Sequence, residues 1–413
     1  MKIRFSPLFL TALPILALAA FSYRASHQRI PALERQPELF PDGKKGRIGP
    51  PGRNRRVVIG YVGGYRGLLK DSIDVSRLSH INYAFVDIRN DRAWLHHEAV
   101  DTVNLRYLVG LKARNPDLKI LISIGGWSWS KLFSDAVLTD STRAVFASSA
   151  IDIVSRYDLD GVDIDWEYPG QIGDGNKFRP EDKQDYTLFF KKLREGLDSL
   201  GTVNAKHYFT TTAVGADRPF IEHTEMGKVQ RYLDYVNIMS YDFREGGDDL
   251  SGHHTNLYPS KLDPDTAKPC ADKAVRLFEA AGVPSSKLVM GIAFYAHSWT
   301  VKTTDRHGLY EASDRSAKSP LFHQVGRESD YTLIKDSIVG RNGFARYWDA
   351  DAHAPYIFQA DQKILLSYDD EESVKDKCRY VEKNRLAGVM FWEYSNDKKG
   401  YLLHAIGEEL GYP

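Results

Sequence analysis

The sequence predicts an α/β fold, a closed (β/α)8 TIM barrel of parallel strands that carries a small α+β insertion lobe. Three observations support this prediction. Short apolar runs alternate with helical patterns from residue 57 onward, eight such runs occur, and the alternation is interrupted once, before the last of them. A strand–helix unit repeated eight times favours a closed barrel over an open sheet, because each helix returns the chain to the start of the next parallel strand.

The eight apolar runs have the length and composition of buried strands. They lie at residues 57–62, 81–86, 119–123, 161–166, 208–214, 235–239, 288–294 and 388–392. Each run is apolar over most of its length, as expected for strands that are covered on both faces. These runs are the predicted strands of the barrel.

Helical periodicity is clearest at residues 181–200, which follow a proline at the first turn. Its apolar positions recur at helical spacing and should face the barrel. They are Tyr186, Phe189, Phe190, Leu193 and Leu197. Further helices are expected at residues 141–157, with Ser141 as N-cap, and at 269–281 and 371–384.

The alternation breaks between strands seven and eight, at about residues 300–366. This stretch is polar and aromatic, with short strand patterns at 344–348 and 355–359, and it predicts the inserted lobe. Trp348 within it is equally consistent with a sugar-stacking platform and with the core of the lobe.

The first 25 residues form a basic, then apolar, then small-residue sequence. This order predicts a secretory signal, and the apolar run is short for a membrane span. A secreted, periplasmic or cell-surface protein is therefore expected, with an uncleaved N-terminal anchor as the alternative. Residues 26–56 are rich in Pro, Gly and basic side chains and predict a flexible lead-in to the catalytic domain at 57–413.

Composition narrows the range of partners. Lys+Arg and Asp+Glu both number 55, so nothing indicates nucleic acid, while 12% aromatic residues favour a ligand that stacks. The two cysteines, Cys270 and Cys378, exclude a disulfide framework and a cysteine-based zinc cluster. Cys378 is interpreted as a buried thiol, with pairing to Cys270 as the less favoured alternative. No cofactor and no metal are predicted, and a monomer is the default for a barrel of this size.

Residues 159–170 are the centre of the functional prediction. In a strand, alternation places Asp163, Asp165 and Glu167 on one face, and Val162, Ile164 and Trp166 on the other. Neighbours on one face are about 6.6 Å apart at the backbone, so three carboxylates cannot all ionise independently. One of them should hold a proton at neutral pH.

Two structural alternatives are a solvated strand face and a calcium site. A solvated face more often mixes lysines with its acids, and a calcium loop is usually richer in turns than this run with Val, Ile and Trp. Because buried unpaired acids are costly, the three acids are better interpreted as catalytic groups.

Polar and aromatic side chains gather where the predicted strands end, which is where barrels of this type carry their chemistry. Besides the acids, they are Tyr61, Phe85, Ser123, Gly125, Gly126, Trp127, Met239, Ser240, Tyr241, Asp242, Phe294, Tyr295, Trp392 and Glu393. Acids ringed by aromatics suit a sugar chain, whose ring faces stack on flat side chains while carboxylates act on the glycosidic oxygen.

Three further motifs predict no ligand site. The pair His253-His254 has no third ligand at metal spacing, so an exposed loop is the favoured interpretation. Gly63-Gly64 lacks the spacing of a nucleotide-binding loop. Residues 173–176 are expected to form a loop near the site, without an assigned ligand.

The acidic run resembles a known family. Residues 160–167, DGVDIDWE, match the DxxDxDxE signature of family 18 glycoside hydrolases, the chitinases. The similarity continues through SIGG at 123–126, MSYD at 239–242 and Trp392 at the end of strand eight, and spans about residues 57–410. The insertion resembles the lobe that deepens the cleft in one chitinase subfamily. The resemblance implies a substrate of chitin or N-acetylglucosamine oligosaccharides.

It also implies roles for individual residues. Glu167 would be the general acid and then the base, Asp165 would stabilise the N-acetyl group of the sugar and share a proton with Asp163, and Tyr241 would hydrogen-bond that group. Asp160 and Ser123 would be supporting residues. Substrate contacts are implied for Tyr61, Phe85, Gly126, Trp127, Met239, Asp242, Tyr295 and Trp392, with Trp392 as the floor of the central subsite, Trp127 at an acceptor subsite and Asp242 at sugar hydroxyls.

This arrangement is chemically reasonable. Substrate-assisted glycosidases use the acetamido oxygen of the sugar instead of a second carboxylate as nucleophile. A carboxylate two residues from the acid can then stabilise the oxazolinium charge. Crowding by Asp163 and Asp165 is expected to raise the pKa of Glu167 and keep it an acid near neutrality, with titrations that are coupled.

Strands one and seven depart from the usual pattern of the family. Strand one reads GYVGGY at 60–65, and strand seven reads AFYAH at 293–297 where relatives often have PFYGR. Both differences concern the donor side and hence the preferred chain length. Two alternatives to a chitinase are kept: an endo-β-N-acetylglucosaminidase acting on glycans or peptidoglycan, and a chitin-binding lectin without catalysis.

Overall fold

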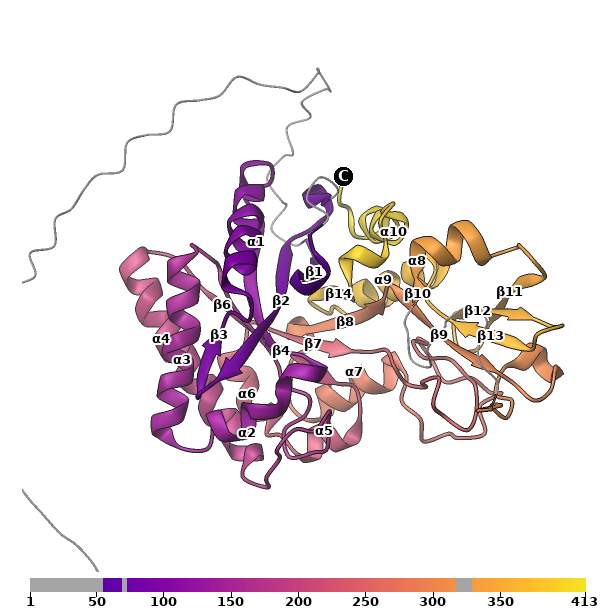
Figure 1. Cartoon of the computed structure of the whole chain (residues 1–413), viewed down its shortest axis with the longest axis horizontal. Coiled ribbons are helices and arrows are strands. Elements are labelled where there is room, and N and C mark those ends of the chain that lie inside the picture. The colour runs from indigo at the N-terminus through magenta and orange to yellow at the C-terminus, as the bar shows by residue number, and fades with distance from the viewer. Residues whose placement is uncertain (1–54, 69–72, 317–328) are drawn as a thin grey trace, which may run out of the picture. The chain divides into compact units, whose positions relative to one another are not determined.

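The computed structural model describes residues 55–68, 73–316 and 329–413 (Figure 1). The predicted signal or anchor at 1–25 and nearly all of the predicted lead-in at 26–56 lie outside the described residues. Within the described part of the chain, no helix combines the length and the apolar composition that crossing a membrane requires.

Eight parallel strands form a closed barrel, as predicted (Figure 1). They are β1 (Val57–Gly63), β2 (His80–Arg89), β4 (Lys119–Gly125), β5 (Gly161–Asp165), β6 (Phe209–Gly215), β7 (Tyr235–Met239), β8 (Leu288–Ala293) and β14 (Gly388–Trp392). Strand β1 pairs with both β14 and β2, and this double pairing closes the ring. The short strand β3 (Arg92–Trp94) adds an antiparallel partner to β2.

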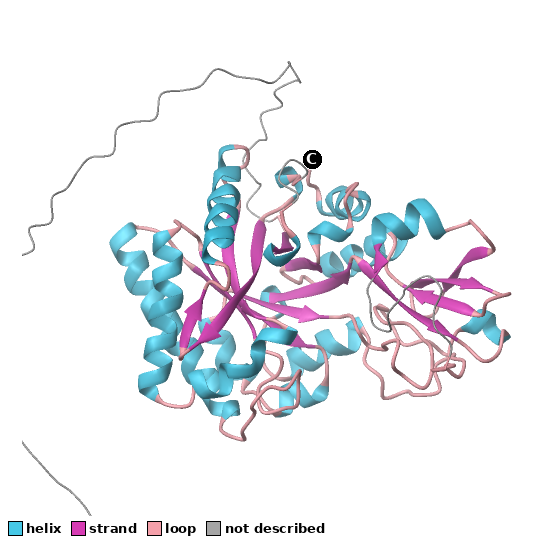
Figure 2. Cartoon of the chain, viewed as in Figure 1, coloured by secondary structure: helices cyan, strands magenta, loops and turns pink. Residues whose placement is uncertain are grey.

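Helices surround the barrel strands (Figure 2). The longer ones are α1 (Glu98–Gly110), α3 (Asp140–Arg156), α4 (Asp182–Asn204), α7 (Ala271–Ala280), α9 (Glu371–Lys383) and α10 (Tyr401–Leu410), and the short ones are α2 (Phe133–Ala136), α5 (Arg218–Glu222) and α6 (Met226–Val229). The four predicted helices are confirmed, but the predicted N-cap Ser141 is wrong. Helix α3 instead begins at Asp140, and its N-cap is Thr139, whose side chain accepts a hydrogen bond from the Thr142 backbone N–H.

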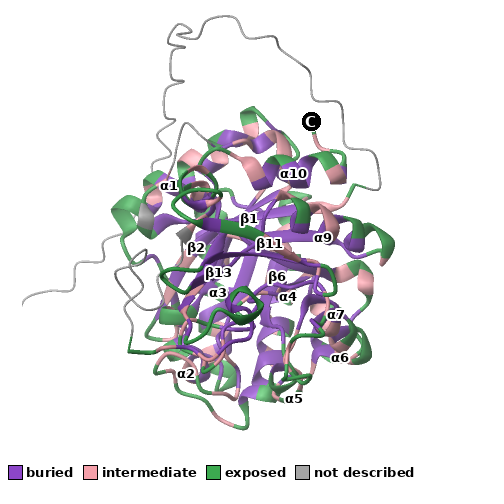
Figure 3. Ribbon diagram, turned by 90° about the vertical axis from the view of Figure 1, so that its right-hand side faces the viewer, coloured by how far each residue is buried: buried purple, intermediate pink, exposed green. Residues whose placement is uncertain are grey.

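Strand β5 shows how the barrel sorts its side chains. Val162 and Ile164 are fully buried in the core between the strands and the helices, where Trp166, just past the strand, stacks on Phe133 at 5.1 Å. The intervening Asp163 hydrogen-bonds to residues of other barrel strands and therefore faces the interior. The barrel strands are buried along most of their length (Figure 3), so both faces of β5 are covered, and the predicted alternation is confirmed.

The insertion lobe is built on an antiparallel five-stranded sheet in the order β10-β9-β13-β12-β11. Its strands are β9 (Tyr295–Thr300), β10 (Ser329–Asp330), β11 (Phe344–Asp349), β12 (Ala354–Gln359) and β13 (Ile364–Ser367). The lobe also contains the short helix α8 (Tyr331–Leu333), which a π-helical turn over Ile334–Ile338 continues. The two strands predicted in this region are confirmed as β11 and β12. The sheet also includes β9, which directly follows β8 and so begins before the predicted start of the lobe.

Both cysteines are buried and free. Cys378 lies on α9 between the buried Val374 and Val381, so its interpretation as a buried thiol is confirmed and no disulfide joins it to Cys270. Trp348 on β11 is half-buried, with the guanidinium of Arg346 5.4 Å from the centre of its ring.

Candidate active site at the carboxyl end of the barrel

Asp163 lies at the centre of a buried hydrogen-bond network. The strand register places Ser123 of β4 and Thr211 of β6 on either side of it. Its Oδ2 accepts hydrogen bonds from Tyr61 Oη at 2.9 Å and Ser123 Oγ at 2.8 Å, while Oδ1 accepts from Thr211 and, at 3.3 Å, from Asn237. Burial raises the pKa of Asp163, and these donors partly offset the rise. The network holds this carboxyl in one orientation.

Asp165, two residues along β5, has quite different surroundings. Its neighbours in register are Gly125 and Ala213, which offer no polar side chain. Its Oδ1 is buried without a hydrogen-bond partner among the described residues. Burial, with the charges of Glu167 and Asp163, raises the pKa of Asp165 well above its usual range. Asp165 therefore holds its proton more tightly than an exposed aspartate does, and one of its oxygens is ready for a ligand.

Glu167 follows β5 and is anchored through its backbone. Its N–H donates to Ser130 Oγ at 2.9 Å, and this hydroxyl lies 2.9 Å from the carbonyl of Gly126 and 3.1 Å from that of Asp165. The Gly126 N–H donates to the same Asp165 carbonyl at 2.7 Å. Ser130 and Gly126 thus fix the backbone that carries both acids.

The carboxyl of Glu167 titrates near neutrality. Burial raises its pKa to about 7, with a smaller contribution from the charge of Asp242 and an opposing one from a hydrogen bond with Tyr168. Crowding by Asp163 and Asp165 was the expected cause, and this expectation is wrong. The repulsion between the two carboxyls acts on Asp165 instead, whose pKa the charge of Glu167 raises.

Aromatic rings surround the acids. Phe85 stacks on Trp392 with 5.3 Å between ring centres, and Tyr61 lies 6.0 Å from the same indole. Trp392 is half-buried, whereas Trp127 is 52% exposed and lies 6.4 Å from Tyr168. The partly exposed indoles of Trp127 and Trp392 leave flat surface on which a sugar ring can stack.

Strand β7, the residues just after it and the start of β9 contribute the remaining residues expected to contact substrate. Tyr241 lies edge-on to Tyr295, 5.9 Å between ring centres, and its hydroxyl is 3.8 Å from Met390 Sδ. Met239 packs in the cluster that contains Met390 and the half-buried Trp392. Tyr295 is buried and donates its hydroxyl to Asp242 Oδ1 at 2.7 Å.

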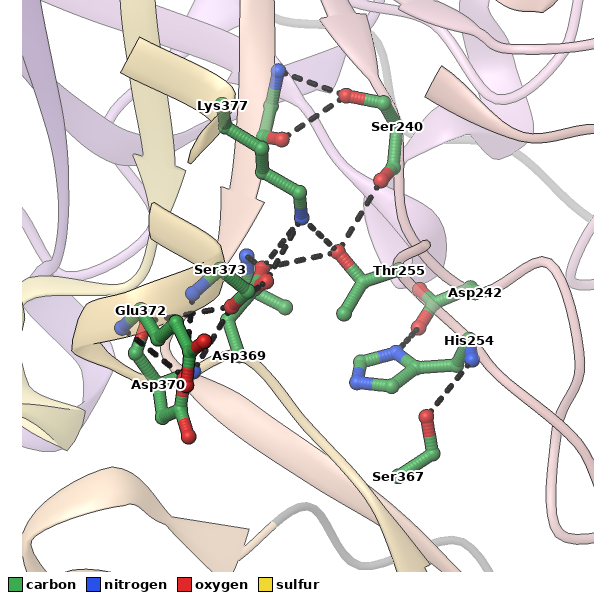
Figure 4. A network of polar contacts seen from close by, with 12 residues as sticks. Ser240, Asp242, His254, Thr255, Ser367, Asp369, Asp370, Glu372, Ser373 and Lys377 are labelled. Carbon is green, nitrogen blue, oxygen red and sulfur yellow. Dashed lines mark hydrogen bonds and ion pairs between the residues drawn. The ribbon is translucent and has the colours of Figure 1, made fainter. Parts of the chain in front are cut away.

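Two histidines face Asp242. His297 Nε2 lies 2.7 Å from Asp242 Oδ1. His254 Nδ1 lies 3.6 Å from the same oxygen, and Figure 4 shows this contact. Although burial opposes ionisation, His254 and His297 hold the pKa of Asp242 well below its usual range. Burial lowers the pKa of His254 to about 4, so its ring is neutral at pH 7.

The interpretation of His253-His254 as an exposed loop is therefore wrong. Both rings are buried, and His253 Nε2 lies 3.2 Å from Asp349 of the lobe. The backbone N–H of His254 donates to Ser367, also of the lobe, at 2.9 Å. The lobe covers this loop, which no local sequence pattern could show.

Asp160 does not lie with the other acids. It precedes β5 at the amino end of the barrel, where it pairs with Lys112 at 2.6 Å and Lys206 at 2.8 Å and accepts a hydrogen bond from the Ile120 N–H. These partners hold the pKa of Asp160 below its usual value against the effect of its burial. Its supporting role is thus to fix the start of β5, three residues from Asp163, and it does not touch the site.

Comparison with known proteins agrees with this geometry. Residues 57–397 match the glycosyl hydrolases family 18. The chain belongs to this family. Chitinase A1 of Niallia circulans is 35% identical over 392 residues, which cover 82% of this chain and 55% of that protein. The chain thus spans about half the length of that relative. Chitinase B of Serratia marcescens is 29% identical over 80% of this chain and 75% of its own length.

Solved structures of family 18 proteins have the same fold. An N-acetylglucosaminidase from Paenibacillus barengoltzii superposes with a TM-score of 0.78 at 44% identity, covering 86% of this chain and 99% of that one. Chitinase ChiA74 from Bacillus thuringiensis superposes with a TM-score of 0.80 at 32% identity, covering 86% of this chain and 70% of that one.

Several site residues of this family 18 chain were not identified from the sequence. Thr211 and Asn237 were missed, although each is a polar residue in an apolar strand next to the acids. Ser130 was missed because it lies in a short helical turn that gives no signal of its own. His297 was noticed only as a departure from the family pattern, and its contact with Asp242 depends on the lobe strand β9.

A buried ion pair supports the loop that carries Asp242 and His254 (Figure 4). Lys377 on α9 donates to both oxygens of Asp369, at 2.6 and 2.9 Å, and to Thr255 Oγ1 at 2.7 Å. Lys377 and Asp369 are 0% and 1% exposed, so water screens neither charge. The pair therefore joins α9 to the residue next to His254.

Proposed function

We propose that the protein is a chitinase that hydrolyses β-1,4 links between N-acetylglucosamine units, with retention of configuration and with the substrate's own acetamido group as nucleophile. The observation that carries this proposal is the contrast between Asp163 and Asp165. The first is fully hydrogen-bonded, whereas the second is buried, has a raised pKa and has one oxygen without a partner among the described residues. Such a group is suited to a polar ligand atom of an entering sugar.

The reaction follows from these positions. Glu167 gives its proton to the glycosidic oxygen as that bond breaks, and the acetamido oxygen of the same sugar bonds to the anomeric carbon. The oxazolinium ion so formed is stabilised by Asp165, which passes its proton toward Asp163, and by the hydroxyl of Tyr241. Glu167, now a carboxylate, takes a proton from water as the water oxygen attacks the anomeric carbon and the bond from that carbon to the acetamido oxygen breaks. The proton on Asp163 then returns to Asp165. Trp392 is proposed as the platform beneath the reacting sugar.

A soluble N-acetylglucosamine hexamer tests the proposal. Early products observed by proton NMR should carry the β-anomer, because two displacements at one carbon restore its configuration. Early α-anomer would refute substrate-assisted retention. Binding without cleavage would favour a chitin-binding lectin, which the retained Glu167, Asp165 and Tyr241 argue against. Neither binding nor cleavage would favour an endo-β-N-acetylglucosaminidase acting on glycans or peptidoglycan.

A second candidate is an N-acetylglucosaminidase that releases single sugars. The solved structure with that description is 44% identical to this chain, above the 32% of the chitinase from Bacillus thuringiensis. The product profile of the hexamer separates the two activities. Dimers and trimers as the first products support a chitinase, whereas monomer accumulating from the start supports the second candidate.

The pH dependence of kcat/KM should show a basic limb with an apparent pKa near 7. Glu167 must be protonated to act as the acid, and burial raises its pKa to about 7. Activity should therefore be retained from pH 5 to 6.5 and fall about tenfold for each pH unit well above 7. A profile that stays flat to pH 9 would contradict the assignment of Glu167.

Replacement of Asp165 by Asn should lower kcat by roughly 10²- to 10³-fold, as expected when one stabilising group is lost from the transition state. Asn preserves the volume but cannot pass a proton to Asp163. Asp160→Asn is a matched control, because Asp160 lies outside the site. If both variants lost kcat equally, the role of Asp165 would be refuted.

We further propose that the protein is exported and monomeric. The basic, apolar and small-residue order of the first 25 residues supports a signal, with an uncleaved anchor as the alternative. N-terminal sequencing of the protein recovered from its native cells tests this: loss of about the first 25 residues supports a cleaved signal, and an intact N-terminus in the membrane fraction supports the anchor.

A further inference from the structure

Asp242, His254 and His297 form a cluster of metal-ligating side chains. Each offers one ligand atom, and these atoms lie within 4.8 Å of one another. The three residues come from different parts of the chain: Asp242 follows β7, His254 lies in the loop after it, and His297 is on β9 of the lobe. The convergence of three such segments makes this cluster a feature of the tertiary fold.

The donor set and its spacing suit a transition metal. Two imidazoles and a carboxylate are typical ligands of Zn²⁺, whose bonds to them are about 2.0–2.2 Å long. Tetrahedral ligand atoms at such distances are about 3.3–3.5 Å apart. The distances from Asp242 Oδ1 are 2.7 Å to His297 Nε2 and 3.6 Å to His254 Nδ1. Shifts of less than an ångström would therefore bring each nitrogen to ligand spacing from this oxygen.

The state of His254 is the second observation. Its ring is completely buried, and neither Nδ1 nor Nε2 has a hydrogen-bond partner among the described residues; Nδ1, the nitrogen that faces the cluster, lies 3.6 Å from Asp242 Oδ1. A buried polar nitrogen normally has a partner, because leaving it without one costs about 1–3 kcal/mol. Asp242 has a side chain that is 39% exposed, which gives a cation a route to the cluster.

We propose that Asp242, His254 and His297 bind a divalent transition-metal cation of the Zn²⁺ class, which leaves one coordination position open to water or a sugar hydroxyl. On binding, the cation replaces the proton between His297 and Asp242, and that proton leaves to solvent or to the other nitrogen of the ring. Hard cations such as Mg²⁺ prefer oxygen ligands and should not bind.

The consequence for activity rests on the proposed function. Asp242 is expected to contact sugar hydroxyls, and its charge raises the pKa of Glu167. A bound cation would neutralise that charge and hold the carboxylate, so Zn²⁺ should inhibit hydrolysis reversibly. Binding itself is measured without substrate, so failure of the chitinase assignment would leave the binding result intact.

Calorimetric titration with ZnCl₂ and MgCl₂ tests the proposal on the parent, His297→Arg and His254→Gln. Arg can still donate to Asp242 but cannot bind a metal, which makes His297→Arg the sharper variant. The control is His96→Ala, since His96 and His97 form an exposed pair with ring centres 4.5 Å apart. Thermal unfolding without metal verifies that each variant is folded.

We expect one Zn²⁺ per chain in the parent, no Mg²⁺ binding, a Kd raised at least tenfold in His297→Arg, and an unchanged Kd in His96→Ala. A Kd for Zn²⁺ that is also raised in His254→Gln would show that His254 is a ligand. The proposal is overturned if the parent binds no Zn²⁺, if His297→Arg binds as tightly as the parent, or if His96→Ala abolishes binding.

Discussion

Replacing Glu167 with Gln is expected to lower kcat on the N-acetylglucosamine hexamer by roughly 10²- to 10⁴-fold, the usual contribution of a positioned acid and base. Gln has nearly the same volume, and its side-chain amide can still form hydrogen bonds, but it has no acidic proton to give to the leaving oxygen. The backbone that carries it is held by Ser130, so the geometry of the neighbouring acids should be preserved. Binding of the hexamer should therefore remain.

Two measurements separate lost chemistry from lost structure. The Kd for the hexamer, followed by the fluorescence of Trp127 and Trp392, should change less than about threefold. The control Glu98→Gln alters an exposed acid on α1, 3.3 Å from Arg156, and should keep full activity. If Glu167→Gln retained more than a tenth of the parent's kcat, the assignment of the acid would be wrong.

The same substitution should change the dependence of stability on pH. The folded-state pKa of Glu167 is raised from 4.5 to about 7, so the folded parent binds a proton more tightly than the unfolded chain. This contribution to stability is complete below pH 4.5 and is lost as pH rises through 7, by up to about 3 kcal/mol. Glu167→Gln should therefore unfold at a higher temperature than the parent at pH 8, and the gap should shrink toward pH 4.5.

The strands and the acids could be predicted because the signals that define them are local. Alternation along β5 places Asp163 and Asp165 inside the barrel and Val162 under the helices, and it needs only neighbouring residues to be recognised. The role of Asp160 was harder to assign, because a sequence motif does not show at which end of the barrel each of its residues lies. Asp160 precedes the strand and so lies at the end opposite the site, next to Lys112 and Lys206.

What could not be predicted depends on contacts between distant segments. The pKa of Glu167 is set mainly by burial, which only the packed site produces, and the repulsion between the acids raises the pKa of Asp165 instead. His254 is buried because Ser367, 113 residues away, binds its backbone. The sequence around a histidine in a polar loop does not show that a lobe built from residues much further along the chain covers it.

Replacing Lys377 with Met should destabilise the protein by about 3–5 kcal/mol, the usual cost of leaving one charge of a buried ion pair without its partner. Burial lowers the pKa of Lys377, and the charge of Asp369 opposes that effect. With the ammonium gone, Asp369 keeps its contacts with Thr255 and Ser373, at 2.9 and 2.7 Å, but no positive charge balances it. Denaturant unfolding at pH 7 measures the loss.

Lys375→Met is the matched control, because Lys375 lies on the same helix but is partly exposed. Its pair with Glu408 at 2.7 Å is screened by water and should contribute much less to stability. The double variant Lys377→Met/Asp369→Asn removes both charges and should recover part of the loss. Equal destabilisation by Lys375→Met and Lys377→Met would refute the argument, because burial, and not charge alone, makes the Lys377 pair costly to break. The network also contacts the residue next to His254, so Lys377→Met should weaken substrate binding through Asp242 even where the protein remains folded.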